Sequence, residues 1–118
     1  MIKKTVDSNG AMILKDGENI IFSLTTELDL AEKSARILLE GNLRTDTQAY
    51  LGAELQFYSV AALNRLEVDC AKLSAISPGC FGELLDLKIK TAEKSAGAVF
   101  LNKPDCLLNM EKLMGKKL

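Results

Sequence analysis

Residues 66–85 read LEVDCAKLSAISPGCFGELL, and this segment joins a predicted strand to a predicted helix. The alternation over Leu66–Cys70 is typical of a short strand that ends near Cys70. A loop of small residues, Ala71–Gly79, follows, and the apolar spacing beyond it predicts a helix over about 79 to 94. Loops between the C-terminal end of a strand and a helix N-terminus are the usual place for sites in α/β sheets. This junction is therefore the candidate site.

The residues at the helix mouth favour a well-defined N-terminus. Pro78 fixes its φ angle, Gly79 permits close approach of another group, and Ser77 is a good N-cap residue. The first N–H groups of a helix have no partner within the helix, so they are free to meet a ligand or a protein. Two interpretations stay open here: a recognition surface, or a well-capped helix and nothing more.

The residues before this segment alternate between strand and turn signals. Two apolar runs around Asp16-Gly17, Met12–Leu14 and Ile20–Leu24, predict a β-hairpin. Two further strands are predicted over 27–32 and 35–40, with a turn at Lys33-Ser34. The apolar residues then recur at spacings of three to four, which predicts a helix of about 16 residues with Thr45-Asp46-Thr47 as its N-cap region. Its apolar stripe consists of Leu51, Leu55, Tyr58 and Ala62.

The residues after the segment predict one more strand and one more helix. The apolar run Gly97–Leu101 is typical of a buried central strand. Pro104 and Asp105 open a helix that ends near Gly115. Its predicted buried face consists of Leu107, Leu108, Leu113 and Met114. The order predicts one α/β domain over residues 1–118, with a mixed sheet of about four to six strands, helices mainly on one face, and an N-terminal β-hairpin extension over about 1–25.

Composition excludes several functions. The 118 residues carry 15 Lys+Arg and 16 Asp+Glu, a net charge of −1 that gives no overall attraction to nucleic acid or anionic lipid. There is no His, which excludes His catalysis and His-ligated metals. Phosphate-binding loops and a GxSxG elbow are absent. Carboxylate pairs such as Asp105/Glu111 have the spacing of surface residues. We therefore expect no catalytic residue, cofactor or metal, and no enzymatic activity.

The same reasoning predicts the compartment. The three cysteines, Cys70, Cys80 and Cys106, form no CxxC motif, and their odd number fits a reducing compartment. No apolar run is long enough to cross a bilayer, and the N-terminus does not resemble a signal peptide. We expect a soluble, cytoplasmic protein with no direct membrane insertion.

The candidate segment resembles the STAS domain (sulfate transporter and anti-sigma factor antagonist). Members carry a strand like LVLDLSGV, then IDSSG, then a helix like LGALL; the corresponding residues here are 66–73, 76–80 and 81–85. The strand exit at 37–43, the strand at 98–102 and the helix end at 113–115 extend the similarity to about residues 27–115. The resemblance implies a STAS-like core with an added hairpin. It also implies a bacterial signalling protein that regulates transcription by binding a kinase-like anti-sigma factor or related protein.

The resemblance further implies a switch, which this sequence cannot carry in the usual form. In the family, phosphorylation of a Ser or Thr at the helix mouth weakens or reverses binding, because phosphate adds charge and acceptor oxygens. Here Gly79 occupies the position of the family's phosphoacceptor serine. Pro78 stands where the family has the serine before it, Ser77 where it has the acidic residue, and Cys80 where it has the following glycine. Three readings remain: an unswitched binder, a phosphoacceptor moved to Ser77 or Ser74, or modification of Cys80, whose thiolate a helix N-terminus favours.

The predicted partner-binding residues lie in the loop and on the helix that follows it. They are Ser74, Ser77, Pro78, Gly79, Cys80, Phe81, Glu83, Asp86 and Lys90, with Lys94 as a further rim residue. Two alternatives to the signalling role stay open: a STAS subunit that binds the ATPase of an ABC-type lipid or organic-solute transporter, and a nucleotide-binding module. The N-terminal extension would cover a sheet edge or mediate a homodimer.

Overall fold

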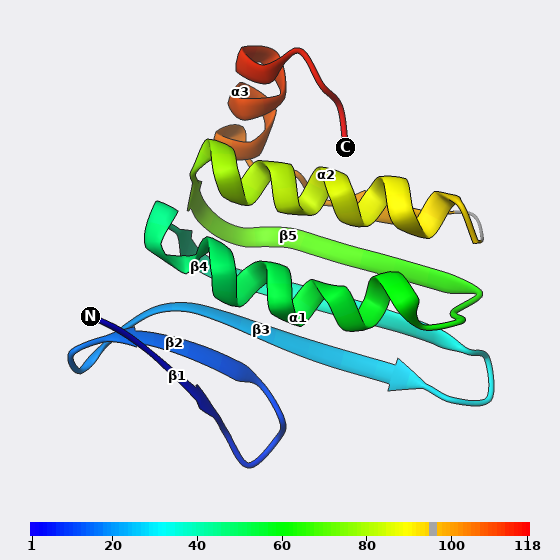
Figure 1. Ribbon diagram of the computed structural model, residues 1–118, viewed down its shortest axis with the longest axis horizontal. Helices are drawn as coiled ribbons and strands as arrows, with labels where there is room; N and C mark the ends of the chain where they lie inside the picture. Colours follow the sequence, from blue (N-terminus) through cyan, green and yellow to red (C-terminus); the bar gives the residue numbers. More distant parts are fainter. Residues whose placement is uncertain (95–96) are drawn as a thin grey trace.

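Six strands form one mixed sheet in the computed structural model of the protein, which describes residues 1–94 and 97–118 (Figure 1). Neighbouring strands in the sheet follow chain order. They are β1 (Ile2–Val6), β2 (Met12–Asp16), β3 (Asn19–Asp29), β4 (Ser34–Leu43), β5 (Arg65–Ile76) and β6 (Ala98–Leu101). The pairs from β1 to β4 are antiparallel, whereas β4–β5 and β5–β6 are parallel.

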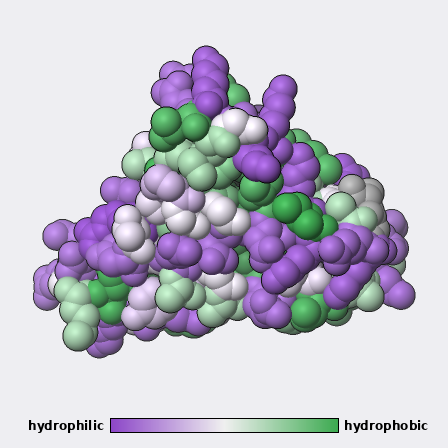
Figure 2. All heavy atoms as spheres, turned by 45° about the horizontal axis from the view of Figure 1, so that its top comes forward, coloured by the Kyte–Doolittle hydropathy of each residue, from purple (hydrophilic) through white to green (hydrophobic). Residues whose placement is uncertain are grey.

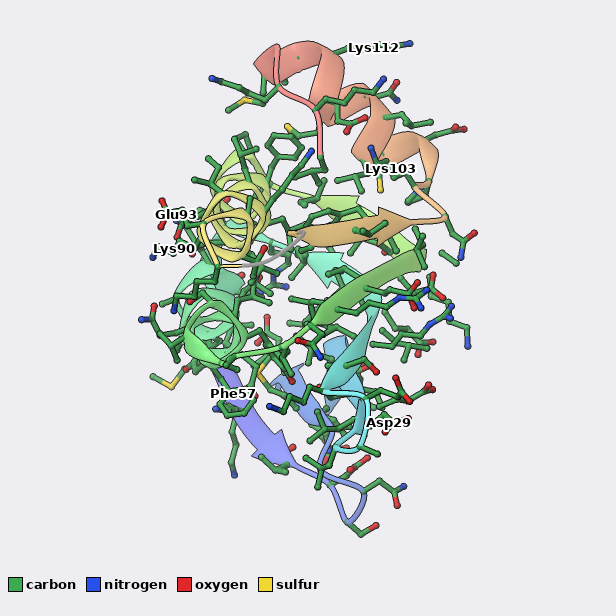
Figure 3. All side chains as sticks on the ribbon, turned by 90° about the vertical axis from the view of Figure 1, so that its right-hand side faces the viewer. Asp29, Phe57, Lys90, Glu93, Lys103 and Lys112 are labelled. Atoms are coloured by element: carbon green, nitrogen blue, oxygen red, sulfur yellow. The ribbon has the colours of Figure 1, made fainter. Side chains whose placement is uncertain are left out.

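The helices lie in the connections between the parallel strands and after β6. A 3₁₀ turn over Thr45–Thr47 leads into α1 (Gln48–Val60), α2 spans Pro78–Ala92, and α3 spans Asp105–Met114. Figures 1 and 3 show α1 and α2 side by side on one face of the sheet, while α3 lies on the side of α2 that faces away from α1. The predicted fold class, a mixed sheet with helices mainly on one face, is confirmed. No described helix combines the length and the apolar character that crossing a membrane requires.

The core fills the space between these two helices and the sheet. The largest fully buried side chains come from both the sheet and the helices, which pack against each other through them. They are Phe22, Phe81, Met12, Leu14, Ile37, Leu39, Leu43, Leu51, Leu84, Leu87, Leu107 and Val68. Burial of such side chains contributes roughly 1.5–3 kcal/mol each, which is the main favourable term in folding.

The N-terminal part differs from the prediction in two ways. The hairpin around Gly17 is confirmed as β2–β3, but β3 continues without interruption to Asp29, so a separate strand over 27–32 is wrong, and the boundary near residue 25 falls inside β3. Strand β1 was not predicted. None of its five residues is fully buried and only Ile2 and Thr5 are partly buried, so the segment lacks a clear apolar face. Because β2 pairs with β3, the added strands cover an edge that β3 would otherwise expose.

The segment after Cys70 is strand, not the predicted loop. Strand β5 runs on through Ile76 and pairs with β4, with register shifts between Leu38 and Glu40 and between Gly41 and Asn42. Such irregularities break the regular alternation of inward and outward side chains. The sequence of this segment therefore lacks the period of two by which a strand is recognised.

Two predictions of burial at the C-terminal end are wrong. Strand β6 is the edge of the sheet, not a central strand, and its Val99 is 48% exposed. Of the predicted apolar face of α3, only Leu107 is buried, and Leu113 is 74% exposed, because this helix lies at the margin of the fold and contacts β5 and α2 only locally. The predicted helix end is confirmed: Gly115 adopts the left-handed conformation at φ 66°.

Candidate protein-docking site

The N-terminus of α2 is capped as its sequence predicts. The Ser77 backbone is extended, and its Oγ accepts a hydrogen bond of 3.2 Å from the backbone N–H of Cys80. Pro78 occupies the first turn, where its missing N–H costs nothing. The Ser77 hydroxyl is thus already engaged in holding the helix mouth.

The segment that leaves β4 forms a support beneath this mouth. Ser77 N–H donates to the Leu43 carbonyl at 2.8 Å, and the Cys80 thiol donates to the Arg44 carbonyl at 3.3 Å. Thr47 Oγ1 donates to the same carbonyl at 2.7 Å and makes no side-chain cap for α1, contrary to the prediction for residues 45–47. Two strand ends that are far apart in sequence therefore share one hydrogen-bonded junction.

Gln48, the first residue of α1, covers the position of Gly79. A Cβ built on Gly79 would overlap with the Gln48 side-chain amide, so a larger residue at this position would need the flexible Gln48 side chain to move. Gln48 Nε2 also donates to Glu83 Oε1 at 3.4 Å. Glu83 in turn lies across α1, because a Cβ on Gly52 would sit 2.8 Å from Glu83 Oε2. The two helices are in close contact at this end.

The predicted site residues divide into surface and core. Ser74, Pro78 and Asp86 are exposed, and Ser77, Gly79, Glu83 and Lys90 are partly exposed. Cys80 and Phe81 are fully buried at 0% exposure, so their side chains are not available to a partner. This corrects their place among the predicted contacts. It also removes the basis for modification of Cys80, which needs an accessible thiol.

Charged groups around the site are mostly paired within the molecule. Arg44 bridges Asp16 and Asp46, and its hydrogen bond lowers the pKa of Asp46 below the ordinary value. Lys90 and Asp86 form an i,i+4 ion pair of 2.9 Å on α2. Lys94 lies past the end of α2 and donates to the Ser59 carbonyl at 3.0 Å. Among the described residues, no group of three His, Cys, Asp or Glu is placed to hold a metal ion.

Sequence reasoning missed Arg44, Thr47 and Gln48 as neighbours of the site. The available signal was topological: a strand–helix–strand order predicts that β4 and β5 are parallel, and parallel strands end at the same edge of a sheet. Residues that directly follow β4 therefore meet residues that directly follow β5. The individual contacts, however, depend on register shifts that the sequence does not reveal.

Replacing the N-cap serine should weaken the fold. We expect Ser77→Ala to lower the free energy of unfolding by about 1 kcal/mol, because the Cys80 N–H loses its acceptor. Ser77→Asp should retain most of that energy, since its carboxylate caps equally well. Urea denaturation of both variants measures this. Ser74→Ala, at an exposed residue, is the control and should stay within about 0.5 kcal/mol of the natural protein.

The three thiols should differ in reactivity. Cys70 and Cys80 are fully buried, and burial raises the pKa of Cys70 to about 12, whereas Cys106 is only partly buried. In the native protein we expect an alkylating reagent to modify Cys106 first and slowly, and all three thiols after unfolding. Mass spectrometry of timed samples gives the order. Alkylation of Cys80 before Cys106 would contradict the closed mouth and restore Cys80 as a modification site.

Comparison with known proteins supports the fold through structure alone. No family model and no curated protein matches the sequence. Three solved structures are similar. An antisigma-factor antagonist STAS domain from Rhodobacter sphaeroides has a TM-score of 0.59 at 19% identity, over 70% of this chain and 87% of that one. The anti-sigma factor antagonist SpoIIAA in its unphosphorylated form has a TM-score of 0.63 at 17% identity, over 78% of this chain and 80% of that one. An anti-sigma factor antagonist from Mycobacterium paratuberculosis has a TM-score of 0.60 at 15% identity, over 78% of each chain. The strand order, the helices on one face and these three likenesses together show that this chain has the fold of the STAS domain.

Proposed function

We propose that the chain is a non-enzymatic, cytoplasmic regulatory domain that binds a protein partner of the anti-sigma factor type. The docking surface consists of the end of β5 and the first turns of α2, with Ser74, Pro78 and the exposed side of the helix as its contacts. The observation that carries the proposal is the capped mouth of α2, where Ser77 and Cys80 donate hydrogen bonds to carbonyl groups at the end of β4. A surface held in this way loses little conformational entropy on binding.

We further propose that binding is not switched by phosphorylation at position 79. Gly79 has no hydroxyl that could accept a phosphate, and the Gln48 amide lies against this position. Ser77 is committed to capping α2, although a phosphate at an N-cap would be compatible with the helix dipole. The unswitched reading therefore agrees best with the contacts at the mouth.

The test is affinity recovery of partners by the tagged chain in its own host, with variants that alter one surface only. Gly82 is exposed on α2 and a Cβ there meets open space, so Gly82→Arg adds a bulky charge to the docking surface without strain. Asn9→Arg adds the same charge in an exposed turn between β1 and β2. We expect Asn9→Arg to retain the partner and Gly82→Arg to lose at least about tenfold of it.

Mass spectrometry of the recovered complexes gives the remaining outcomes. Recovery of a kinase-like protein that Gly82→Arg releases supports the proposal, and the unshifted mass of the bait supports the unswitched form. Recovery of an ABC ATPase in its place assigns the chain to transport. Retention of the partner by Gly82→Arg places docking elsewhere and refutes the proposed surface.

A further inference from the structure

A shallow hollow lies between α3 and the residues that follow this helix. Its volume is about 420 Å³, and Leu108 and Gly115 give it uncharged surface. Three lysines, Lys112, Lys116 and Lys117, line the same hollow and are called the rim lysines below. In Figure 2, which brings the top of Figure 1 forward, hydrophilic residues project at this end of the molecule beside small apolar patches. The hollow thus combines apolar surface with positive charge.

The rim lysines have no carboxylate partner of their own. None of the ion pairs formed by residues 1–94 and 97–118 includes them. Glu111 also lines the hollow, but it is only 8% exposed and is bonded to Lys103 Nζ at 2.9 Å. The same ammonium donates to the Leu118 main-chain oxygen at 2.7 Å, so both acceptors are already engaged. The hollow therefore attracts negative charge from outside the molecule.

The turn between β3 and β4 has the opposite character. Its tip, residues 28–32, reads Leu-Asp-Leu-Ala-Glu, and all five residues are exposed. Leu28 and Leu30 are 52% and 79% exposed, which leaves two large apolar side chains in water. Asp29 and Glu32 lie on either side of Leu30 in the sequence. The β3–β4 tip thus presents apolar side chains between carboxylates.

The carboxylates of the tip outnumber the cations around them. None of the three carboxylates in residues 27–32 forms an ion pair with another described residue. Arg36 lies opposite the first of them in the sheet, but it is bonded to a carboxylate of β5 at 2.8 Å. Arg65 is bonded to another carboxylate of β5 at 2.9 Å. Lys33 alone is left to offset three negative charges, so the tip attracts positive charge.

Hydrogen bonds hold the backbone of the tip in place. Asp29 Oδ1 accepts from the Glu32 N–H at 3.1 Å. From the other side, the Asn64 N–H donates to the Lys33 carbonyl at 2.7 Å, and Asn64 Nδ2 donates to the Glu32 carbonyl at 3.3 Å. A segment that is ordered before it binds loses less conformational entropy when it docks.

The hollow and the tip lie far apart on one molecule. Figure 1 shows α3 at the top and the β3–β4 turn at the lower right, and Figure 3 shows Lys112 and Asp29 widely separated as well. A chain therefore cannot place its own tip in its own hollow. Two different surfaces that complement each other make a heterologous contact, which leaves one surface of each copy open for a further copy.

From these two complementary surfaces we infer that the chain associates head to tail with itself, the β3–β4 tip of one copy docking in the α3 hollow of the next. Leu30 enters the hollow against Leu108, and the carboxylates of Asp29 and Glu32 meet the rim lysines in charge-assisted hydrogen bonds. The inference is independent of the proposed function, because neither surface contains the docking residues of α2.

The test is the mass of the full chain in solution, measured by sedimentation and light scattering over a range of concentrations. The contact is small, so we expect a dissociation constant of about 0.1–1 mM and species that grow beyond the dimer as concentration rises. Because the contact depends on charge, higher salt should weaken it.

Two variants remove one surface each, at side chains that are exposed. The tip variant combines Leu30→Ser with Glu32→Gln, and the rim variant combines Lys112→Glu with Lys116→Glu. Each should raise the dissociation constant at least about tenfold. The control combines Lys3→Glu with Lys4→Glu on β1, which gives the same net charge as the rim variant and should associate like the natural chain.

A mixture of the two variants tests the head-to-tail geometry. The tip variant keeps an intact hollow, and the rim variant keeps an intact tip. An equimolar mixture should therefore form a species of two chains and nothing larger, because the neutral tip and the acidic rim left at its ends do not attract each other.

Four results would overturn the inference. They are a chain that stays monomeric up to roughly 1 mM, an association that either variant leaves intact, a mixture that contains only monomers, and a control that associates as weakly as the rim variant. The last result would assign the effect to net charge and not to the rim lysines.

Discussion

Gly41→Ala is expected to lower the free energy of unfolding by about 3 kcal/mol or more. Gly41 has a φ of 108°, in a region that residues with a Cβ rarely adopt. It also pairs with Phe22 in β3, where an added Cβ would overlap with the Ile21 carbonyl oxygen and lie 3.1 Å from the Phe22 Cα. Both obstacles are backbone atoms of a central strand pair, so relief requires β3 and β4 to move apart.

Urea denaturation of the natural protein and the variant measures this loss as a shift of the midpoint at unchanged slope. Gly82→Ala is the matched control, because Gly82 lies in the exposed part of α2 with open space around its Cα. That variant should be more stable by about 1 kcal/mol, the helix preference of alanine over glycine. A loss below about 1 kcal/mol for Gly41→Ala would contradict the tight β3–β4 approach.

Glu111→Gln should lower the free energy of unfolding by about 2 kcal/mol at neutral pH. Glu111 is only 8% exposed, and its Oε2 accepts from Lys103 Nζ at 2.9 Å and from the Leu118 N–H at 2.7 Å. Figure 3 shows Lys103 beside α3 at the base of this cluster. Glutamine keeps an acceptor for the Leu118 N–H, but it removes the negative charge beside Lys103, whose ammonium then keeps its hydrogen bond of 2.7 Å to the Leu118 main-chain oxygen.

The effect should depend on pH in a defined direction. Burial raises the pKa of Glu111, but the hydrogen bonds from Lys103 and Leu118 outweigh it, so the pKa in the folded protein lies below the ordinary 4.5. The stabilisation is therefore complete above pH of about 4.5 and is lost as the pH falls through the folded pKa. The difference between the natural protein and Glu111→Gln should shrink toward zero in acid.

An exposed ion pair provides the control for this prediction. Asp86 and Lys90 are 51% and 45% exposed in their side chains, so Asp86→Asn should change the free energy of unfolding by less than about 0.5 kcal/mol at any of these pH values. A loss for Glu111→Gln no larger than that of Asp86→Asn would show that the cluster around Leu118 contributes no more than a surface pair.

Features with a local cause were predicted from sequence. The start of α2 at Ser77-Pro78 and the end of α3 at Gly115 follow from capping preferences, which involve only neighbouring residues. The Gly17 turn and the helical stripe of Leu51, Leu55 and Tyr58 are of the same kind. The order of these elements also predicted a partly parallel sheet, and the structure shows that β4 and β5 are one of its parallel pairs.

Features that depend on distant backbone segments were not predictable. Asp105 and Glu111 have the spacing of surface residues, yet Glu111 is buried because residues 116–118 return against α3. Cys80 follows an exposed mouth in sequence, yet the end of β4 lies directly over its thiol.

The sequence by itself therefore determined where α2 begins and α3 ends, that the sheet is partly parallel, and that the junction before α2 is the place to look for a site. The tertiary structure alone decided that Gln48 lies against Gly79, that the end of β4 covers the Cys80 thiol, and that Gly41 must remain glycine. The physical reason is range: capping and periodicity act within one turn or one strand, whereas burial and steric exclusion are set by whichever part of the chain the register of the sheet brings into contact.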